Sequence, residues 1–284
     1  MSAYNKLLKK IKSNNFKVGV IGLGYVGLSL CDKLIQKNIE VYGFEKELEK
    51  INKLKNGKCY IPNIKKKTIN YFRNNKNTLC DNYQNISFID VLVVCLPTPL
   101  RNFKTPDMSI LYNCINKLKI QIKSNQILII ESTVYPGATE ELFKKINYKN
   151  KFILGKNFFL IFSPERVNPG DTSFSYDKTP KVVGGATRNC KKLGEIFYKK
   201  VSNKIHLTPD IKTAEMSKLL ENSYREVNIG LINEIKLISE KLKINIWDVI
   251  DAAKTKNFGF TAFYPGPGTG GHCIPIDPIY LVWA

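Results

Sequence analysis

The sequence is poor in arginine and histidine and contains no long apolar run. Of its 44 basic residues only five are arginine, and two of its 284 residues are histidine. No stretch approaches the eighteen or more uninterrupted apolar residues of a membrane span, and the first fifteen residues lack the apolar core of a signal peptide. We therefore expect a cytoplasmic protein with no membrane partner.

The cysteines do not have the spacing that a metal site or a disulfide framework requires. The seven lie at positions 31, 59, 80, 95, 114, 190 and 273, and no two are spaced as CxxC. Histidines and carboxylates form no cluster with metal-ligand spacing either. The sequence thus predicts no disulfide network and no metal site, and we expect most of the cysteines to be small buried residues.

Basic residues are in large excess and give a formal net charge of +20 at pH 7. Nucleic-acid-binding proteins often have such an excess, because clustered basic side chains neutralise phosphates. Here lysine outnumbers arginine 39 to 5, and the lysines are spread over the whole chain. We interpret the charge as a solvated basic surface and expect no nucleic-acid partner.

Short apolar strands alternate with helical segments over the first 207 residues. The residue patterns predict strands at 17–21, 39–44, 88–95, 127–131, 158–162 and 204–207, and helices at 25–37, 108–122 and 138–146. Such alternation predicts an α/β fold with a Rossmann-like, doubly wound and mostly parallel sheet. The polar, lysine-rich residues 1–15 are expected to form a helical or frayed lead-in, with the fold beginning at Phe16.

A helical part of the chain follows, from residue 208 to 284. Thr208-Pro209-Asp210 has the chemistry of a helix start, and only Gly230 interrupts the helical pattern before about Lys243. At 1.5 Å per residue this helix would span roughly 50 Å, which favours a bridge between domains or subunits. A shorter helix is expected at 246–254. We expect a central catalytic and dimerisation domain here, with a homodimer formed through the long helix.

A glycine fingerprint, Gly22-Leu23-Gly24-Tyr25-Val26-Gly27, lies between the first strand and the first helix. Its first glycine permits the turn, the second lets the backbone approach a pyrophosphate, and the third allows close helix packing. Glu45 follows the second strand, where it would bind ribose hydroxyls and repel a 2′-phosphate. Residues 16–207 are therefore predicted to bind NAD in preference to NADP.

Four further segments combine polar, acidic and nucleophilic side chains. They are Cys95–Pro99, Glu131–Gly137, Ser163–Asp171 and Gly270–Pro278. The first three follow predicted strands, where an open α/β sheet places its ligands. We expect these three to face the nicotinamide.

Cys273 lies in the glycine-flanked fourth segment, which is the setting of a reachable thiol. A low thiolate pKa requires nearby positive charge, and Lys218 on the long helix can supply it. Lys218, Asn222 and Arg225 are spaced i, i+4 and i+7, so they project from one face of that helix. His272 is not expected to act as the base for Cys273, because adjacent side chains diverge.

Taken together, the segments resemble the UDP-glucose/GDP-mannose dehydrogenase family over nearly all of residues 16–284. Within the family, Ser163–Gly170 and Gly271–Pro278 look like the UDP-N-acetylglucosamine 6-dehydrogenase branch, whereas the UDP-glucose branch has a lysine at the position of Ile276. The resemblance implies an NAD-dependent, four-electron oxidation of the C6 hydroxyl of a UDP-N-acetylhexosamine. UDP-N-acetylglucosamine is favoured, and the pathway implied is surface polysaccharide precursor synthesis.

The resemblance also implies a role for each site residue. Cys273 would trap the C6 aldehyde as a thiohemiacetal, and the later thioester would be hydrolysed. Lys218 and Asn222 would stabilise oxyanions, while Asp277, Glu165 and Thr133 would position or activate water. Substrate contacts are expected from Arg166, Val167, Lys218, Asn222, Arg225 and Gly270. Cofactor contacts are expected from Gly22, Gly24, Tyr25, Val26, Gly27, Glu45, Pro97, Thr98 and Thr133.

Family members continue into a second Rossmann-like domain that grips the UDP moiety, and this sequence has no counterpart of it. We therefore expect the 284-residue chain to bind NAD but to turn over little UDP-sugar by itself. The alternatives are a UDP-glucose 6-dehydrogenase, a two-electron hydroxyacid-type dehydrogenase that does not need Cys273, and a non-catalytic NAD-binding fragment. Both the gluco and the manno epimer of the sugar stay open.

Overall fold

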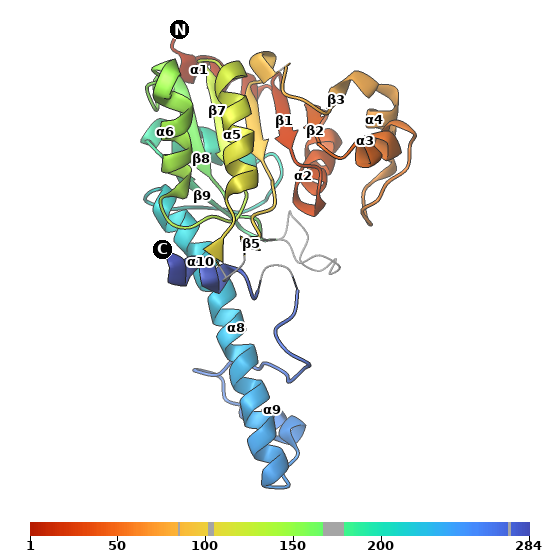
Figure 1. The fold of residues 1–284 in the computed structure, drawn as a ribbon, viewed down its shortest axis with the longest axis vertical. Coiled ribbons are helices and arrows are strands. Elements are labelled where there is room, and N and C mark those ends of the chain that lie inside the picture. Colours follow the sequence, from red (N-terminus) through yellow and green to blue (C-terminus); the bar gives the residue numbers. More distant parts are fainter. Residues whose placement is uncertain (85, 102–104, 167–178, 272–273) are drawn as a thin grey trace. The chain divides into compact units, whose positions relative to one another are not determined.

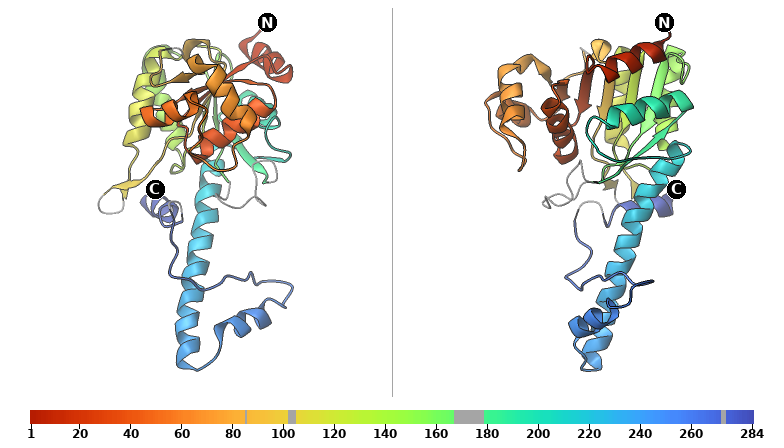
Figure 2. Two further views of the ribbon diagram at one scale, coloured as in Figure 1. Left: turned by 90° about the vertical axis from the view of Figure 1, so that its right-hand side faces the viewer. Right: turned by 180° about the vertical axis from the view of Figure 1, so that it is seen from behind.

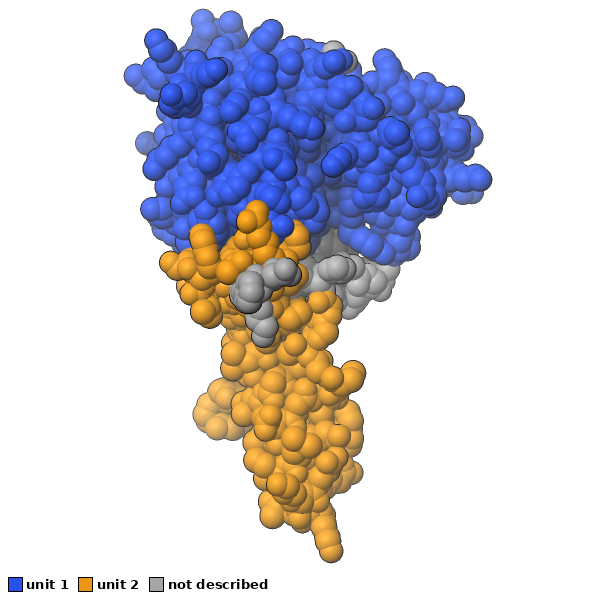
Figure 3. Space-filling model, in the orientation of Figure 1, with its two compact units in different colours: residues 1–98, 107–215 blue, residues 99–106, 216–284 orange. Residues whose placement is uncertain are grey.

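The structure, a computed structural model, describes residues 1–84, 86–101, 105–166, 179–271 and 274–284. Contacts divide the chain into two compact units, shown in Figure 3. Unit 1 consists of residues 1–98 and 107–215, and unit 2 of residues 99–106 and 216–284. Each unit is described by itself.

Unit 1 is built on a twisted sheet whose described strands lie in the order β10-β9-β8-β7-β4-β1-β2-β3. Neighbouring strands are parallel except β8 and β9, which are antiparallel. The central strands are apolar runs that are buried along their length, as expected for a sheet covered on both faces. The strands are β1 (Lys17–Ile21), β2 (Glu40–Phe44), β3 (Leu79–Cys80), β4 (Val91–Val94), β7 (Gln126–Ile130), β8 (Phe158–Phe162), β9 (Lys181–Gly185) and β10 (Ile205–Leu207).

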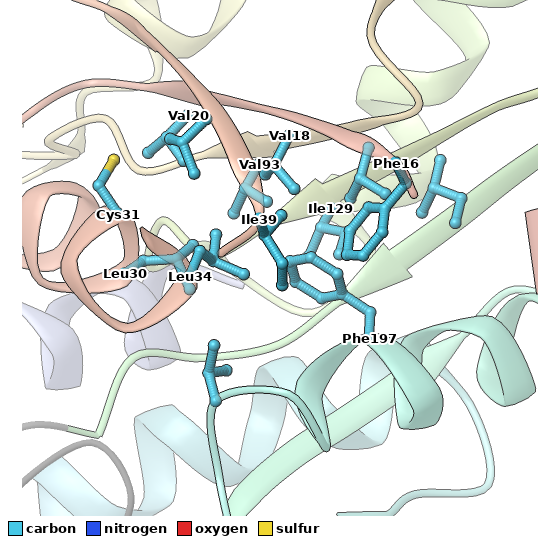
Figure 4. Close-up of a cluster of buried hydrophobic side chains, with 14 of the residues drawn as sticks. Phe16, Val18, Val20, Leu30, Cys31, Leu34, Ile39, Val93, Ile129 and Phe197 are labelled. Carbon is cyan, nitrogen blue, oxygen red and sulfur yellow. The ribbon is translucent and has the colours of Figure 1, made fainter. Parts of the chain in front are cut away.

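Helices cover both faces of this sheet. On one face, α2 (Tyr25–Gln36) and α7 (Arg188–Tyr198) share a core with alternate residues of the strands, and α3 (Leu48–Lys55) and α4 (Lys66–Asn74) join them. Figure 4 shows part of this core, including Val18, Leu34 and Phe197. On the other face lie α5 (Ser109–Gln121) and α6 (Ala138–Asn150), in front of the sheet in Figure 1. The predicted doubly wound α/β fold is confirmed.

The first fifteen residues contribute a helix to this fold. Helix α1 (Ala3–Lys12) buries Leu7 and Ile11 in the same core and packs against α7. Figure 2 shows this helix from behind, near the N-terminus. Lys10 forms an ion pair of 2.6 Å with Asp90, which also accepts the backbone N–H of Lys17. Apolar residues spaced four apart in a lysine-rich segment were sufficient to bury one helix face.

The strand order reverses direction at β1. From β1 the chain moves to β2 and β3 on one side, then returns to β4, β7 and β8 on the other side. In open α/β sheets, ligands bind outside the carboxyl ends of the strands at such a switch point. The turn that follows β1 and the segments that follow β4, β7 and β8 therefore meet at one edge of the sheet.

Unit 2 contains most of the long helix that the sequence predicts. Helix α8 (Ile211–Lys241) begins in unit 1 and continues through unit 2, and α9 (Ile246–Ala253) follows it. Strands β5 (Leu100–Arg101) and β6 (Thr105–Pro106) pair antiparallel. The Tyr280 hydroxyl on α10 (Asp277–Trp283) donates to the Pro99 carbonyl at 3.3 Å. No helix in the described part of the chain is long and apolar enough to cross a membrane.

Candidate active site

The glycine turn after β1 has the geometry that a dinucleotide needs. Gly22 has a φ of +89°, and a Cβ there would lie 2.6 Å from the Cys95 carbonyl oxygen. A Cβ on Gly27 would lie 1.9 Å from the Gly22 carbonyl oxygen, so both positions require glycine. A Cβ on Gly24 would meet no atom within 4 Å, and α2 begins there without a side-chain cap. The turn thus leaves open space at a helix N-terminus, which suits a pyrophosphate.

Glu45 follows β2 and lies directly against this turn. One of its carboxylate oxygens accepts the Leu23 N–H at 2.9 Å, and the other accepts the N–H groups of Lys46 at 2.8 Å and Glu47 at 3.1 Å. A carboxylate offers about four lone-pair sites, so acceptor capacity remains for ribose hydroxyls. Tyr25 is exposed and Val26 half-buried at the same edge. The residues present therefore fit an NAD molecule bound across the turn.

The segments after β4 and β7 are joined to each other by hydrogen bonds. The Leu96 N–H donates to the Ser132 hydroxyl at 2.9 Å, and the Ser132 N–H donates to the Val94 carbonyl at 3.2 Å. Pro97 and Thr98 continue from Leu96, and Thr133 continues from Ser132. The structure thereby brings Thr98 and Thr133, two predicted cofactor contacts, to neighbouring strand ends, as the sequence predicts for these segments.

A buried polar cluster lies beneath these two segments. Glu131 has a fully buried side chain whose Oε1 lies 3.1 Å from the Lys181 Nζ and accepts the Tyr198 hydroxyl at 2.5 Å. The Cys95 Sγ lies 4.0 Å from the other carboxylate oxygen. Burial, and then the neighbouring Glu131, raise the pKa of the Cys95 thiol and of the Tyr198 hydroxyl well above their usual ranges. Both therefore stay neutral beside the charged pair.

The segment after β8 contributes Glu165 and Arg166, which are half-buried. The Arg166 Nη1 donates to the Pro180 carbonyl at 2.8 Å. Val167, a predicted substrate contact, lies outside the described residues, as do His272 and the predicted nucleophile Cys273.

Unit 2 brings together three predicted catalytic residues. The Asn222 Nδ2 on α8 donates to the Asp277 Oδ2 at 2.5 Å, and Lys218 lies one turn earlier on α8. Lys218 and Asp277 are both buried. Burial raises the pKa of Asp277 to about 6, while the positive charge of Lys218 and the hydrogen bond from Asn222 oppose the shift.

Two predicted substrate contacts in unit 2 are open to solvent. Arg225 continues the i, i+4, i+7 series of Lys218 and Asn222 along α8, but it is exposed, whereas Lys218 is buried. Gly270 is exposed with a φ of +41°. The three members of the series therefore differ sharply in burial although they share a helix face.

Three buried charged or polar residues were not predicted from the sequence. Lys181 and Tyr198 complete the cluster around Glu131, and Glu215 accepts the backbone N–H groups of Gly137 and Thr139 at the start of α6. The available signals were a lysine at the head of an apolar strand and a glutamate on an apolar helix face. Neither pattern predicts which residue the side chain contacts, because the contacts of Lys181 and Glu215 are with residues far away in the sequence.

The six cysteines that the structure describes are all free, and Cys31, Cys114 and Cys190 among them are buried. Within the described ranges, no group of three or more His, Cys, Asp or Glu side chains could hold a metal ion.

Comparison with protein families places both parts of the chain. Residues 16–202 match the NAD binding domain of the UDP-glucose/GDP-mannose dehydrogenase family, and residues 212–284 match its central domain. NAD, the predicted cofactor, is the one named for this domain.

Individual relatives differ in the sugar that their names specify. The UDP-N-acetyl-D-mannosamine dehydrogenase of Methanococcus aeolicus is 34% identical over 98% of this chain and 63% of its own length. The UDP-N-acetyl-D-glucosamine 6-dehydrogenase of Pseudomonas aeruginosa is 35% identical over 94% of this chain and 63% of its own length. A solved UDP-D-ManNAc dehydrogenase of Pyrococcus horikoshii is 30% identical, covers 93% of this chain and 63% of its own, and has a TM-score of 0.86.

The chain thus spans a little under two thirds of the length of these relatives. The two family matches together account for nearly all of residues 16–284, as the sequence motifs predict. This chain belongs to the UDP-glucose/GDP-mannose dehydrogenase family and contains its NAD binding and central domains.

Proposed function

We propose that this chain is the NAD-binding and catalytic part of an enzyme that oxidises the C6 hydroxyl of a UDP-N-acetylhexosamine to a carboxylate. The observation that carries the proposal is the group of Lys218, Asn222 and Asp277, which combines a buried cation, a half-buried amide donor and a buried carboxylate of raised pKa. Stabilising an oxyanion and moving a proton beside it require such a set of groups.

Each predicted residue has a task in this proposal. NAD, when bound, supplies the hydride acceptor. Cys273 attacks the C6 aldehyde, Lys218 and Asn222 stabilise the resulting oxyanion, and the thioester formed after the second oxidation is hydrolysed. Asp277, Glu165 and Thr133 position or activate the water for that hydrolysis. Arg166, Val167, Arg225 and Gly270 contact the substrate.

UDP-N-acetylglucosamine is the proposed substrate, with UDP-N-acetylmannosamine and UDP-glucose as the alternatives. Ile276 supports an N-acetylhexosamine over glucose, because the UDP-glucose branch has a lysine at that position. Relatives named for each N-acetylhexosamine epimer are nearly equally similar to this chain. The epimer therefore has to be decided by assay.

The test is the number of NADH molecules released per molecule of UDP-sugar consumed. The chain is assayed alone and fused to the C-terminal third of the Methanococcus aeolicus relative, with the three UDP-sugars in parallel. Two NADH per UDP-N-acetylglucosamine and a uronic acid product are expected. One NADH per sugar would contradict the proposal in favour of a two-electron dehydrogenase, and NAD binding without turnover in the fusion would favour a non-catalytic module.

We also propose that the protein is a homodimer formed through α8. Leu220, Tyr224, Val227 and Leu231 follow one another at spacings of four, three and four residues, so they share a helix face. Each of these side chains is more than half exposed. Apolar residues that form a continuous stripe on a long helix are characteristic of a contact surface.

A further inference from the structure

The buried ion pair of Glu131 and Lys181 lies at the edge of the sheet where the cofactor segments emerge. Glu131 directly follows β7, and Lys181 is the first residue of β9. Because β9 runs antiparallel to β8, its first residues lie at the same edge as the carboxyl ends of β7 and β8. The two side chains are 0% and 5% exposed. The ammonium group of Lys181 therefore lies at the edge of the sheet where ligands bind, although Lys181 is at the start of its strand.

Tyr198 is a second hydrogen-bond donor to the Glu131 carboxylate, and it comes from a helix, not from the sheet. Its hydroxyl, at the end of α7, donates to the Glu131 Oε1, and its ring lies against the ammonium group, with Lys181 Nζ 5.0 Å from the ring centroid. A hydrogen bond and a cation–π contact therefore hold both members of the pair. Rotation of the Glu131 carboxylate would break contacts with two different elements.

Glu131 is connected to the cofactor segments by a short chain of bonds. Its own N–H donates to the Val94 carbonyl at 2.9 Å, and the next residue, Ser132, accepts the Leu96 N–H. Leu96 leads directly to Pro97 and Thr98. The backbone at Glu131 and Ser132 is thus bonded to the segment from which Thr98 departs. The Glu131 side chain, held by Lys181 and Tyr198, is attached to this same backbone, which leads on to Thr133.

These segments lie on the nicotinamide side of the proposed NAD site. Glu45, which would bind the adenosine ribose, follows β2, on one side of β1 in the sheet. β4 and β7 lie on the other side. A dinucleotide that crosses the glycine turn with its adenosine half beside Glu45 places its other half over the ends of β4 and β7.

A buried ion pair is a poor way to stabilise a fold, because the desolvation of both charges offsets their attraction and apolar side chains of similar volume often do as well. Its advantage is directional: charge-assisted hydrogen bonds have fixed geometry, whereas apolar contacts do not. We propose that Glu131, held by Lys181 and Tyr198, is a positioning residue that sets Leu96–Thr98 and Ser132–Thr133 against the nicotinamide half of NAD.

The role of Glu131 rests on the proposed function, because it requires NAD at the turn Gly22–Gly27. The experiment compares the affinities of NAD and of ADP-ribose, which lacks the nicotinamide, by titration calorimetry. Tyr198→Phe removes the hydroxyl that donates to Glu131 and keeps the ring. The double variant Glu131→Gln/Lys181→Met removes both charges together and keeps the volumes, so no unpaired charge is left buried. A second readout is the emission maximum of bound NADH, which reports the surroundings of the nicotinamide.

Both variants are expected to weaken NAD binding about five- to tenfold, the loss associated with one hydrogen bond, and to leave ADP-ribose affinity within about twofold. NADH emission should shift toward that of the free cofactor. Thr68→Val is the matched control, because the Thr68 hydroxyl also donates to a buried carboxylate, Asp32, at 2.7 Å. It should change neither affinity nor the emission.

Equal losses of NAD and ADP-ribose affinity, or no loss of either, would overturn the role of Glu131 while leaving the NAD site intact. If the double variant does not fold, Tyr198→Phe alone decides between these outcomes. A wild-type chain that binds neither ligand would instead contradict the cofactor site of the proposed function, and the role of Glu131 with it.

Discussion

At the scale of a single residue, Glu45 is expected to determine the preference between NAD and NADP. Its carboxylate lies against the glycine turn and would face a 2′-phosphate at close range, where like charges repel by a kilocalorie per mole or more. We predict that the wild-type chain binds NAD at least roughly tenfold more tightly than NADP. Glu45→Gln should narrow that ratio, as measured by titration of both cofactors.

NAD affinity itself should also fall in Glu45→Gln, because an amide cannot accept the Leu23 N–H while its other end accepts those of Lys46 and Glu47. Glu47→Gln is the control, since Glu47 is an exposed carboxylate two residues away whose partner is Lys50. An unchanged NAD-to-NADP ratio in Glu45→Gln would show that another group makes the distinction.

Asp277 sets the expected pH dependence of turnover. Burial raises its pKa to about 6, so the carboxylate is half protonated at that pH and is available as a base only above it. For the active fused protein, kcat/KM should rise between about pH 5 and pH 7. Asp277→Asn should lower the rate about a hundredfold or more and remove this rise. Asp248 is an exposed carboxylate on α9, and Asp248→Asn should change neither the rate nor its rise with pH.

At the scale of an element, α6 is capped by a side chain from another helix. Glu215 of α8 is fully buried, and its carboxylate accepts the N–H of Gly137 at 2.5 Å and that of Thr139 at 2.9 Å. Burial raises its pKa to about 7, although these hydrogen bonds oppose the shift. An anion at a helix N-terminus is favourable, but here its desolvation costs more.

Because the folded-state pKa of Glu215 lies above its unfolded value, its contribution to stability is largest below pH 4.5 and is lost as the pH rises to about 7. The expected loss is about 3 kcal/mol, and it should be complete above that range. Glu215→Gln should flatten the fall in unfolding free energy between pH 4.5 and 7. The measurement is urea titration at several pH values. Glu234 is exposed on the same helix, and Glu234→Gln should retain the fall in unfolding free energy.

The sequence predicted those elements whose pattern is strong and local. The continuous apolar run of β8 was predicted with its observed bounds, and α9 to within one residue. Helices α3 and α4 were missed, because few of their residues are buried and lysine and asparagine dominate the rest. β9 was missed because two of its five residues are glycine and its first is lysine. Short apolar runs with such residues do not stand out from loops.

In the candidate site, too, residues in a local pattern could be predicted and residues in long-range contacts could not. The glycine turn and Glu45 were predicted because their spacing is fixed by the path of one βαβ unit. Tyr198 contacts Glu131 across 67 positions of the sequence, and Lys181 contacts it across 50. The packing of α7 on the sheet brings Tyr198 to Glu131, and the pairing of β9 with β8 brings Lys181 there. No local sequence pattern predicts such contacts.

At the scale of the whole molecule, the exposed stripe on α8 predicts the oligomeric state. Sedimentation velocity should give a dimer for the wild-type chain and a monomer for Val227→Glu combined with Leu231→Glu, because two carboxylates cannot be buried unpaired in an apolar contact. Both side chains are exposed in the single chain, at 67% and 55%, so its thermal unfolding should be little changed.

Lys241→Glu is the control for this change, because it places a carboxylate on another exposed residue of the same helix, outside the stripe. It should leave the dimer intact. A wild-type chain that sediments as a monomer at micromolar concentration would contradict assembly through α8.

Helix α1 has a practical consequence for dissecting the protein into parts. The family match begins at residue 16, so a truncation designed from it would discard α1. Leu7 and Ile11 would be lost from the core, at about 1.5–3 kcal/mol each, which is a large share of the stability of an ordinary domain. Such a truncated protein would also expose the apolar surface of α7. The smallest piece suitable for crystallisation or domain exchange therefore starts at Ser2, whose hydroxyl caps α1.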